Sequence, residues 1–492
     1  MGFAAAYLQK HVVKEPWNRQ IRQSPDPQIQ SIVVIPATNE SGLPRCLDSL
    51  FLCKPAAAPA EVIVLINSPS DTPSSSTAVP GKSRGDKSQE TPSPSLIRRN
   101  REIRDAAVDW VREHRREDLV FHILLTEGLP PKHYGAGLAR KLVMDEAVRR
   151  FDLLDRPDGI ILSLDADTVV REDYLEEVTA LFAREPKTDG CSIRFRHPVN
   201  RSEYQQLFTP PSAHDPEAGP SETRHAEAGC REFPSAVFDA IVNYELHQRY
   251  YLQSVRHTGY PWAFHTVGSC FAVRASAYCR QGGMSKRQAG EDFYFIQKVA
   301  MQGRYTECNT TEVYPSPRPS NRVPFGTGPD IARQLDTLQS DRNPVNKPGT
   351  DAEVPGTSAK VPTTGAEALG ADTEVTGTSA GSPIPYPTYH PQLFGHLKKF
   401  YALIPEFYAA ADMRAVQDRL HPLLQQYLAG SRFDESLEEI RRNTATERAF
   451  RHRFFRKFNM FWLLKYLHFA EAQGVEKMEV AVAALQLLQA SG

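Results

Sequence analysis

Gly159-Ile160-Ile161-Leu162-Ser163-Leu164-Asp165-Ala166-Asp167 is the stretch of the chain that decides its fold. A short run of mostly apolar residues is typical of a parallel strand buried on both faces. The two aspartates would leave the sheet at the carboxyl end of that strand, where open α/β sheets bind ligands. Divalent cations prefer oxygen ligands and can link a carboxylate to a diphosphate, so Asp165 and Asp167 are candidate metal ligands. The alternative is a solvated loop, or a helix cap by Asp167 or Thr168.

Strand and helix signals alternate on both sides of this stretch. Apolar runs predict strands at 31–36, 61–66, 120–125 and 267–273. Apolar residues at helical spacing predict helices after the first three strands and another from Tyr174 onward. This β-α-β-α order predicts a mostly parallel α/β sheet with helices on both faces.

The length of 492 residues indicates more than one domain. Three segments have compositions that bury too little apolar area to offset the entropy of the chain, so we expect them to be mobile. From Tyr386 onward the pattern is almost entirely helical. The predicted organisation is an N-terminal extension (1–30), an α/β domain (31–326) with flexible insertions near 68–95 and 209–229, a disordered linker or loop (327–385) and a helical domain (386–492).

Composition narrows the classes of partner and the compartment. A formal net charge of -1 gives no global field that would attract nucleic acid or an anionic membrane. The seven cysteines form no CxxC pair, which favours a reducing cytosol over a disulfide framework or a zinc site. Charged residues precede any long apolar run, so no signal peptide is expected, and the apolar stretch at 458–470 is too short to span a bilayer. We expect a cytoplasmic protein, free or peripheral to the inner membrane.

Polar residues follow the first two predicted strands. Pro36, Ala37, Thr38 and Glu40 would line the edge of the first strand, where a nucleobase or ribose can be held. Asn39 is as well explained as a helix cap. Asn67 ends the second strand and could hydrogen-bond a base or ribose, with an ordinary turn as the alternative. Asp71 follows it and is the weaker candidate.

A helix start at Gly135-Ala136-Gly137 predicts a site for an anion, because its glycines let a ligand approach and its amide groups attract negative charge. Arg140 and Lys141 add charge suited to a diphosphate, although an Arg-Lys pair is more often a solvated basic face.

Gly290-Glu291-Asp292 opens another predicted helix, close to Gly268 of the strand before it. Asp292 could take a proton from an acceptor hydroxyl, whereas Glu291 should point elsewhere, since adjacent helical residues face different ways. Acidic residues in a first helical turn are also common for dipole reasons alone.

Four motifs together resemble those of family 2 glycosyltransferases with the GT-A (Rossmann-like) fold. They are Val34–Glu40, Gly137–Arg140, Asp165–Asp167 and Gly290–Asp292, in that order, and the resemblance covers about residues 30–325. It implies a nucleotide-diphospho-sugar donor, a hydroxyl acceptor and a Mn²⁺ or Mg²⁺ ion held by Asp165 and Asp167. In inverting members the residue that matches Asp292 is the catalytic base.

The sequence also departs from that family. Asn67 stands where relatives usually carry an acidic residue that reads the base, and residues 305–325 hold no histidine as a further metal ligand. The Gln-x-x-Arg-Trp motif and the membrane helices of processive synthases are absent from the sequence, which favours transfer of a single sugar to a soluble or peripheral acceptor.

Two other functions compete with a hexosyltransferase-like activity. A nucleotidyltransferase that makes sugar nucleotides should carry a Gly-rich, Arg-containing loop after the first strand, and Ala37-Thr38-Asn39-Glu40 is not one. A binding protein with a similar fold but no chemistry would not need both aspartates and Glu291-Asp292.

Overall fold

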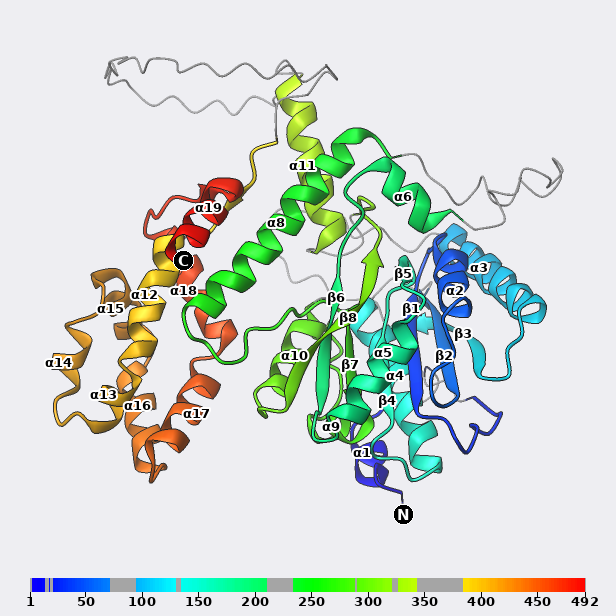
Figure 1. Ribbon diagram of the computed structural model, residues 1–492, viewed down its shortest axis with the longest axis horizontal. Coiled ribbons are helices and arrows are strands. Elements are labelled where there is room, and N and C mark those ends of the chain that lie inside the picture. Colours follow the sequence, from blue (N-terminus) through cyan, green and yellow to red (C-terminus); the bar gives the residue numbers. More distant parts are fainter. Residues whose placement is uncertain are drawn as a thin grey trace, which may run out of the picture.

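The computed structural model describes residues 2–13, 17, 21–70, 94–129, 134–209, 233–287, 290–320, 326–342 and 384–491. Figure 1 shows an α/β part built on one sheet and a helical C-terminal region beside it, with helix α8 between them. Within the described residues the large sheet has eight strands in the order β3-β2-β1-β4-β7-β6-β8-β5. The strands are β1 (Ser31–Ala37), β2 (Ala60–Pro69), β3 (Leu119–Leu129), β4 (Ile160–Ser163), β5 (Thr168–Val170), β6 (Gly190–Phe195), β7 (Phe271–Arg274) and β8 (Tyr305–Pro315).

The central strands are parallel and in register. Ser31 of β1 pairs with Ala60 of β2 on one side and with Ile160 of β4 on the other, and β2 continues in parallel to β3. The remaining pairs are mixed: β6 and β8 are parallel, while β4–β7, β6–β7 and β5–β8 are antiparallel. The carboxyl ends of β1, β2 and β4 therefore meet at one edge, and the prediction of a mostly parallel α/β sheet is confirmed.

Helices cover both faces because side chains alternate along each strand. Val33 and Ile35 pack with residues of α2, α3 and α5 on one face. Ile32 and Val34 pack with residues of α4, α9 and α10 on the other. The helices of this part are α1 (Ala5–Lys10), α2 (Leu43–Phe51), α3 (Pro94–Glu113), α4 (Ala136–Leu153), α5 (Tyr174–Arg184), α6 (Arg201–Phe208), α8 (Ser235–His257), α9 (Ala275–Arg280) and α10 (Glu291–Ala300).

The C-terminal region is helical, as predicted, and has a core rich in phenylalanine. Phe400, Phe407 and Phe454 are fully buried there, in one cluster with Tyr250 of α8 and with Tyr260. The helices are α11 (Thr327–Arg342), α12 (Pro391–Ala402), α13 (Ile404–Ala409), α14 (Met413–Gln417), α15 (Pro422–Ala429), α16 (Phe433–Arg442), α17 (Glu447–Lys457), α18 (Met460–Ala472) and α19 (Val480–Ser491).

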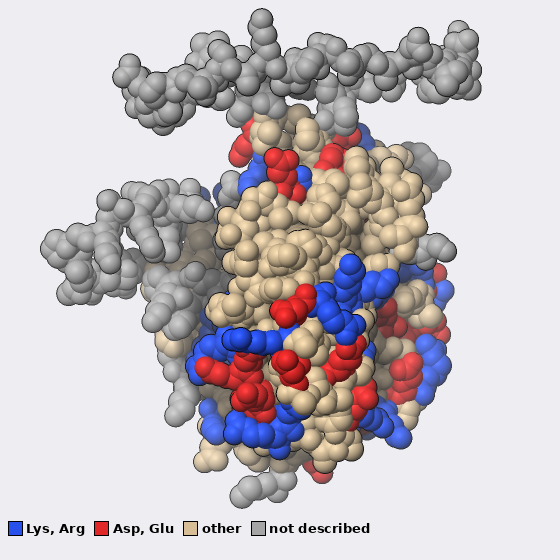
Figure 2. Space-filling model, turned by 90° about the vertical axis from the view of Figure 1, so that its left-hand side faces the viewer, with Lys and Arg blue, Asp and Glu red and all other residues tan. Residues whose placement is uncertain are grey.

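Two further features mark this region. A small antiparallel pair, β9 (Pro387–Thr388) with β10 (Met478–Glu479), joins its beginning to its end. On its outward face, charged side chains of both signs gather in the lower half, while the upper half is largely uncharged (Figure 2). Among the described residues no helix combines the length and apolarity that crossing a bilayer requires.

The prediction of a disordered linker over 327–385 was wrong for its first part, where α11 forms. Ile331, Leu335 and Leu338 lie at helical spacing and pack against α8 and Ile384 in a fourth core cluster. The flanking Gly-, Thr- and Pro-rich sequence concealed this short apolar stripe. The predicted linker at 343–383 lies outside the described residues.

The two predicted insertions are likewise only partly described. β2 continues through Pro69 and α3 begins at Pro94, so both ends of the predicted insertion near 68–95 are ordered structure. The intervening 71–93, with Asp71, and the second insertion over 210–229 lie outside the described residues.

Ile331→Ala is expected to lower the free energy of unfolding by about 2–5 kcal/mol, because it removes buried methyl groups from the α8–α11 contact. Urea denaturation followed by circular dichroism measures the change. The control is Gln339→Ala, an exposed position on the same helix that should leave the midpoint near that of the wild type. Equal midpoints for the two variants would show that α11 does not belong to the folded core.

Candidate active site

Arg140 connects the end of β4 to the start of α10. It is the fifth residue of α4 and is 3% exposed. Its Nη2 donates a hydrogen bond to Asp165 Oδ1 at 2.5 Å, its Nε donates to Ser163 Oγ at 3.1 Å, and its Nη1 donates to the carboxylate of Glu291. One guanidinium group therefore brings together two motifs that lie more than a hundred residues apart in sequence.

Gly268 provides the space in which these groups meet. A Cβ atom at this position would lie 2.8 Å from Arg140 Nη2 and 3.0 Å from Asp292 Oδ2. The carbonyl oxygen of Gly268 also accepts a hydrogen bond of 2.7 Å from Ser163 Oγ. Gly268 lies in a turn, since β7 begins only at Phe271 rather than at 267 as predicted. The close approach of two side chains requires a glycine here.

Asp292 lies beside this cluster and has the electrostatics of a proton acceptor. Burial first, and then the charge of Glu291, raise the pKa of its carboxyl group to about 7. Arg140 and a hydrogen bond of 2.7 Å from the amide of Phe293 act in the opposite direction. A carboxyl group with a pKa near neutrality can accept or release a proton under physiological conditions.

Glu291 was predicted to point away from Asp292, but its side chain lies in the same cluster. Its side chain is 3% exposed and binds Arg140 within the same cluster. Gly290 precedes it in the left-handed conformation, with φ 71°, and α10 begins only at Glu291. The prediction assumed that adjacent residues of a helix face different ways. Glu291 is the first residue of α10, and its ion pair with Arg140 draws its side chain inward.

A second arginine, Arg318, lies just beyond β8 and was missed by the sequence reasoning. Its Nη1 and Nη2 donate to the two carboxylate oxygens of Glu40 at 2.8 and 2.6 Å. Nη2 also donates to Asp167 Oδ2 at 3.1 Å. The available signal was its position, because Arg318 is the only basic residue between 305 and 320. Glu40, predicted as a contact of the donor, is buried and paired with Arg318.

A network of amides joins the ends of β1 and β2. Asn67 Nδ2 donates to the carbonyl oxygen of Ala37 at 2.8 Å, and the buried Asn67 Oδ1 has no partner among the described residues. Asn100 of α3 donates to the Asn67 carbonyl oxygen at 2.9 Å and to Ser68 Oγ at 2.8 Å, and its Oδ1 accepts from the amide of Asn39. Sequence reasoning missed Asn100, because it lies in an otherwise ordinary amphipathic helix.

Two neighbours complete this part of the site. Thr38 Oγ1 lies 2.8 Å from the hydroxyl oxygen of Tyr134. Asn39 adopts a left-handed backbone conformation with φ 49° and does not cap α2, whose N-cap is Gly42. Pro36 and Ala37 end β1 beside them.

Lys141 belongs to a different cluster from Arg140. Its Nζ donates to the hydroxyl group of Tyr7 at 3.0 Å and pairs with Asp145, also at 3.0 Å. Successive helical residues are about 100° apart around the axis. The Arg-Lys pair is therefore divided, with Arg140 at the strand ends and Lys141 against the N-terminal helix α1.

The carboxylates fit a divalent cation that a substrate helps to bind. Among the described residues no three His, Cys, Asp or Glu side chains form a complete protein site for a metal. Glu40 and Glu291 are buried with arginines, whereas Asp165 and Asp167 are 39% and 29% exposed. Magnesium is often bound by only one or two carboxylates together with water and substrate phosphates. Asp165 and Asp167 match that arrangement.

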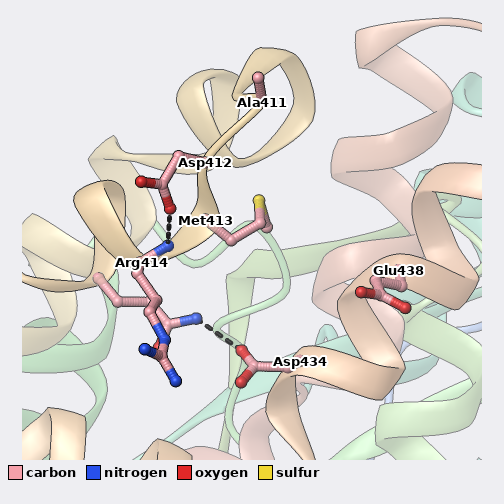
Figure 3. Close-up of a pocket in the computed structure, with 7 residues that line it drawn as sticks. Ala411, Asp412, Met413, Arg414, Asp434 and Glu438 are labelled. Carbon is pink, nitrogen blue, oxygen red and sulfur yellow. Dashed lines mark hydrogen bonds between the residues drawn. The ribbon is translucent and has the colours of Figure 1, made fainter.

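The hollow shown in Figure 3 lies elsewhere, between α14 and α16, and has a volume of about 340 Å³. Its polar groups bind one another: Gln417 donates to Asp434 at 2.6 Å, and Asp412 accepts from the amide of Arg414 at 2.9 Å. It contains none of the residues discussed above, so the candidate site remains the edge of the sheet.

Fold and geometry together define an α/β protein whose candidate site lies at the carboxyl ends of parallel strands and combines acidic side chains with the buried Arg140 and the partly buried Arg318. No protein-family model matches the chain, and no curated protein matches it. Solved structures of glycosyltransferases are similar to it at low identity.

One is residues 1–349 of TarS from S. aureus, with a TM-score of 0.31 and 12% identity over 58% of this chain and 60% of that chain. The same TarS fragment in complex with UDP-GlcNAc has a TM-score of 0.33 and 12% identity over 64% of this chain and 67% of that chain. The mannosyltransferase PcManGT from Pyrobaculum calidifontis, in complex with GDP-Man and Mn²⁺, has a TM-score of 0.31 and 16% identity over 96% of this chain and 92% of that chain. This chain thus spans less than two thirds of the first TarS structure. These similarities are low, and the function is inferred below from the residues of the site.

Proposed function

We propose that the protein is a glycosyltransferase that moves a single sugar from a nucleotide-diphospho-sugar to an acceptor hydroxyl with inversion. The observation that carries the proposal is the double contact of Arg140. It holds the Asp165 end of β4 against Glu291 at the start of α10, and so places Asp292 beside the acidic strand end. A proton acceptor next to a site for a charged leaving group is what direct displacement at an anomeric carbon requires.

Asp292 is the base in this proposal. The acceptor hydroxyl transfers its proton to the Asp292 carboxylate while its oxygen forms a bond to the anomeric carbon. The bond from that carbon to the diphosphate oxygen breaks, and the nucleoside diphosphate leaves with the electron pair. With a pKa of about 7, Asp292 is basic enough to assist and is still deprotonated in much of the protein at neutral pH.

The arginines position the carboxylates for the donor. Arg140 fixes Asp165, and Arg318 fixes Asp167 while neutralising the buried Glu40. A Mn²⁺ or Mg²⁺ ion bound by Asp165 and Asp167 would supply positive charge to the departing diphosphate. Guanidinium groups already in place need no reorganisation during the reaction.

The amide network is the proposed site of the nucleoside. Asn67 Nδ2 is committed to the carbonyl oxygen of Ala37, so Asn67 Oδ1 is left as an acceptor for an N–H group of the base. Thr38 offers a hydroxyl to the base or ribose. Pro36 and Ala37 place these groups at the end of β1, and Gly268, which lets Arg140 and Asp292 approach each other, lies on the sugar side of the proposed site.

Asp167→Ala is expected to weaken donor binding in the presence of Mn²⁺ by at least about tenfold, because charge-assisted contacts contribute most to phosphate binding. Calorimetry with a panel of nucleotide sugars measures this. The control is Asp434→Ala in the hollow of Figure 3, which keeps the same change of charge away from the site. Unchanged affinity in Asp167→Ala would refute the assignment.

A further inference from the structure

Two cations and two aromatic rings form a continuous row where α10 meets α18. The guanidinium carbon of Arg287 lies 4.0 Å from the ring centre of Tyr294, and the rings of Tyr294 and Phe461 are 5.6 Å apart. Lys465 Nζ lies 4.6 Å from the ring centre of Phe461. We call Arg287, Tyr294, Phe461 and Lys465 the aromatic row.

The aromatic row begins on α10, the helix that also carries the proposed base, and crosses from the α/β part to the helical region. Tyr294 follows Asp292 by two residues on α10. Phe293 between them packs against the helical core, which fixes this end of α10 to that region.

The other half of the row is equally fixed. The amide of Met460, at the start of α18, donates a hydrogen bond of 3.2 Å to the hydroxyl group of Tyr260. Trp262 packs edge-on against Phe455 of α17. Both contacts tie the junction of α17 and α18 to the loop that follows α8, so the aromatic row is a defined surface.

Positive charge is concentrated in the segment that leads to Phe461 and Lys465. Residues 448–465 contain six cations, which are Arg448, Arg451, Arg453, Arg456, Lys457 and Lys465, and no acidic residue. All six side chains are exposed, as is Arg287. None of the seven forms an ion pair with any residue that the structure describes. A chain with a net charge of -1 has thus concentrated, on α17 and α18, positive charge that no described residue pairs.

The chemistry of the row defines its ligand. Phe461 is 37% exposed, although burying such a ring would be favourable. Flat rings at a surface offer apolar area to the face of a sugar or polyol, and free cations bind phosphate or carboxylate groups. A neutral saccharide would use the rings but would leave the cations without partners.

We propose that the aromatic row is the acceptor subsite, and that the acceptor is an anionic saccharide or polyol bearing phosphate or carboxylate groups. The inference rests on the proposed function, because it requires the acceptor hydroxyl to reach Asp292. The saccharide lies along the row with its anionic groups on Arg287, Lys465 and the cations of α17. Its terminal hydroxyl is directed to the start of α10.

The test measures binding to the full chain without donor, so that it does not depend on turnover. The probes are an oligogalacturonate for carboxylate, a glycerol phosphate oligomer for phosphate and maltohexaose as the neutral control. At least one anionic probe should bind, more weakly as salt rises. Lys465→Gln and Phe461→Ala should each weaken its binding by about tenfold. Arg414→Gln, an exposed arginine on α14 in the hollow of Figure 3, should not change it.

Several outcomes would overturn the proposal. Binding of maltohexaose as tight as that of both anionic probes would do so. Row variants that bind the anionic probe as well as Arg414→Gln does would also do so. Tighter binding of a single-stranded oligonucleotide, or binding of anionic vesicles that Phe461→Ala leaves intact, would assign the surface to another partner. Failure of the proposed function is separate: no nucleotide sugar would then bind or be turned over, whatever the row binds. Sugar transfer by the wild type that persists unchanged in both row variants would overturn the acceptor subsite alone.

Discussion

Asp292→Asn is expected to lower the rate of sugar transfer by at least about a hundredfold while donor binding stays near that of the wild type. The substitution keeps the shape of the side chain and removes its basicity. Because Asp292 has a pKa of about 7, the wild-type rate should rise with pH up to about 7 and then level off. Initial rates across pH, with donor affinity measured separately, give both quantities.

The stereochemistry of the product is an independent readout for the same residue. Direct displacement assisted by Asp292 gives a glycoside of inverted anomeric configuration, which NMR identifies. Asp336→Asn, an exposed position on α11, is the matched control. Normal transfer by Asp292→Asn, or a product with retained configuration, would exclude Asp292 as the base.

The same substitution should also change stability in a defined direction. Burial raises the pKa of Asp292 from 3.8 to about 7, so the native state holds this proton more tightly than the unfolded chain does. The contribution of Asp292 to the free energy of unfolding therefore falls as pH rises between these two values. Asn carries no such charge, and this part of the pH dependence should disappear in the variant.

Arg140→Met is expected to have the largest effect on folding, a loss of about 3–5 kcal/mol in the free energy of unfolding. It removes the partner of the buried Glu291 and the contact to Asp165, and leaves their charges uncompensated. Chemical denaturation measures the loss, and the exposed Arg184→Met on α5 is the control. Transfer should be lost as well, since the two halves of the site are no longer joined.

A second substitution separates charge from packing. Arg140→Met combined with Glu291→Gln should be more stable than Arg140→Met alone, because the unpaired buried charge has been removed. If the double variant is no more stable than the single one, the packing of Arg140 rather than its pairing with Glu291 supports this part of the fold.

The sheet and the residues at its strand ends could be predicted from local sequence. Runs such as Glu61-Val62-Ile63-Val64-Leu65-Ile66 are short and β-branched and so favour a buried strand, and parallel strands bring their carboxyl ends to one edge. That was enough to bring Asp165, Asn67 and Ala37 to one region. Their roles stay proposals.

The partners of these residues could not be predicted, because ion pairs depend on three-dimensional proximity. Arg318 follows β8 in a Pro-rich segment with no periodic pattern, and only the position of β8 beside β5 brings it to Asp167. Lys141 was assigned with Arg140 because the two are neighbours in sequence. The helix turns them to different clusters, and the N-terminal partner of Lys141 carried no recognisable signal.

The pairing of Glu40 with Arg318 also bears on how the protein is synthesised. The two residues are 278 positions apart in the chain. At about 5–20 residues per second, Glu40 leaves the ribosome roughly 14–56 s before its arginine does. In that interval the end of β1 carries a carboxylate that cannot be buried without its counter-charge, so this corner stays hydrated while the first strands pair. Arg318 would then close the nascent domain, and a ribosome stalled before it should hold a chain that proteases still attack near residue 40.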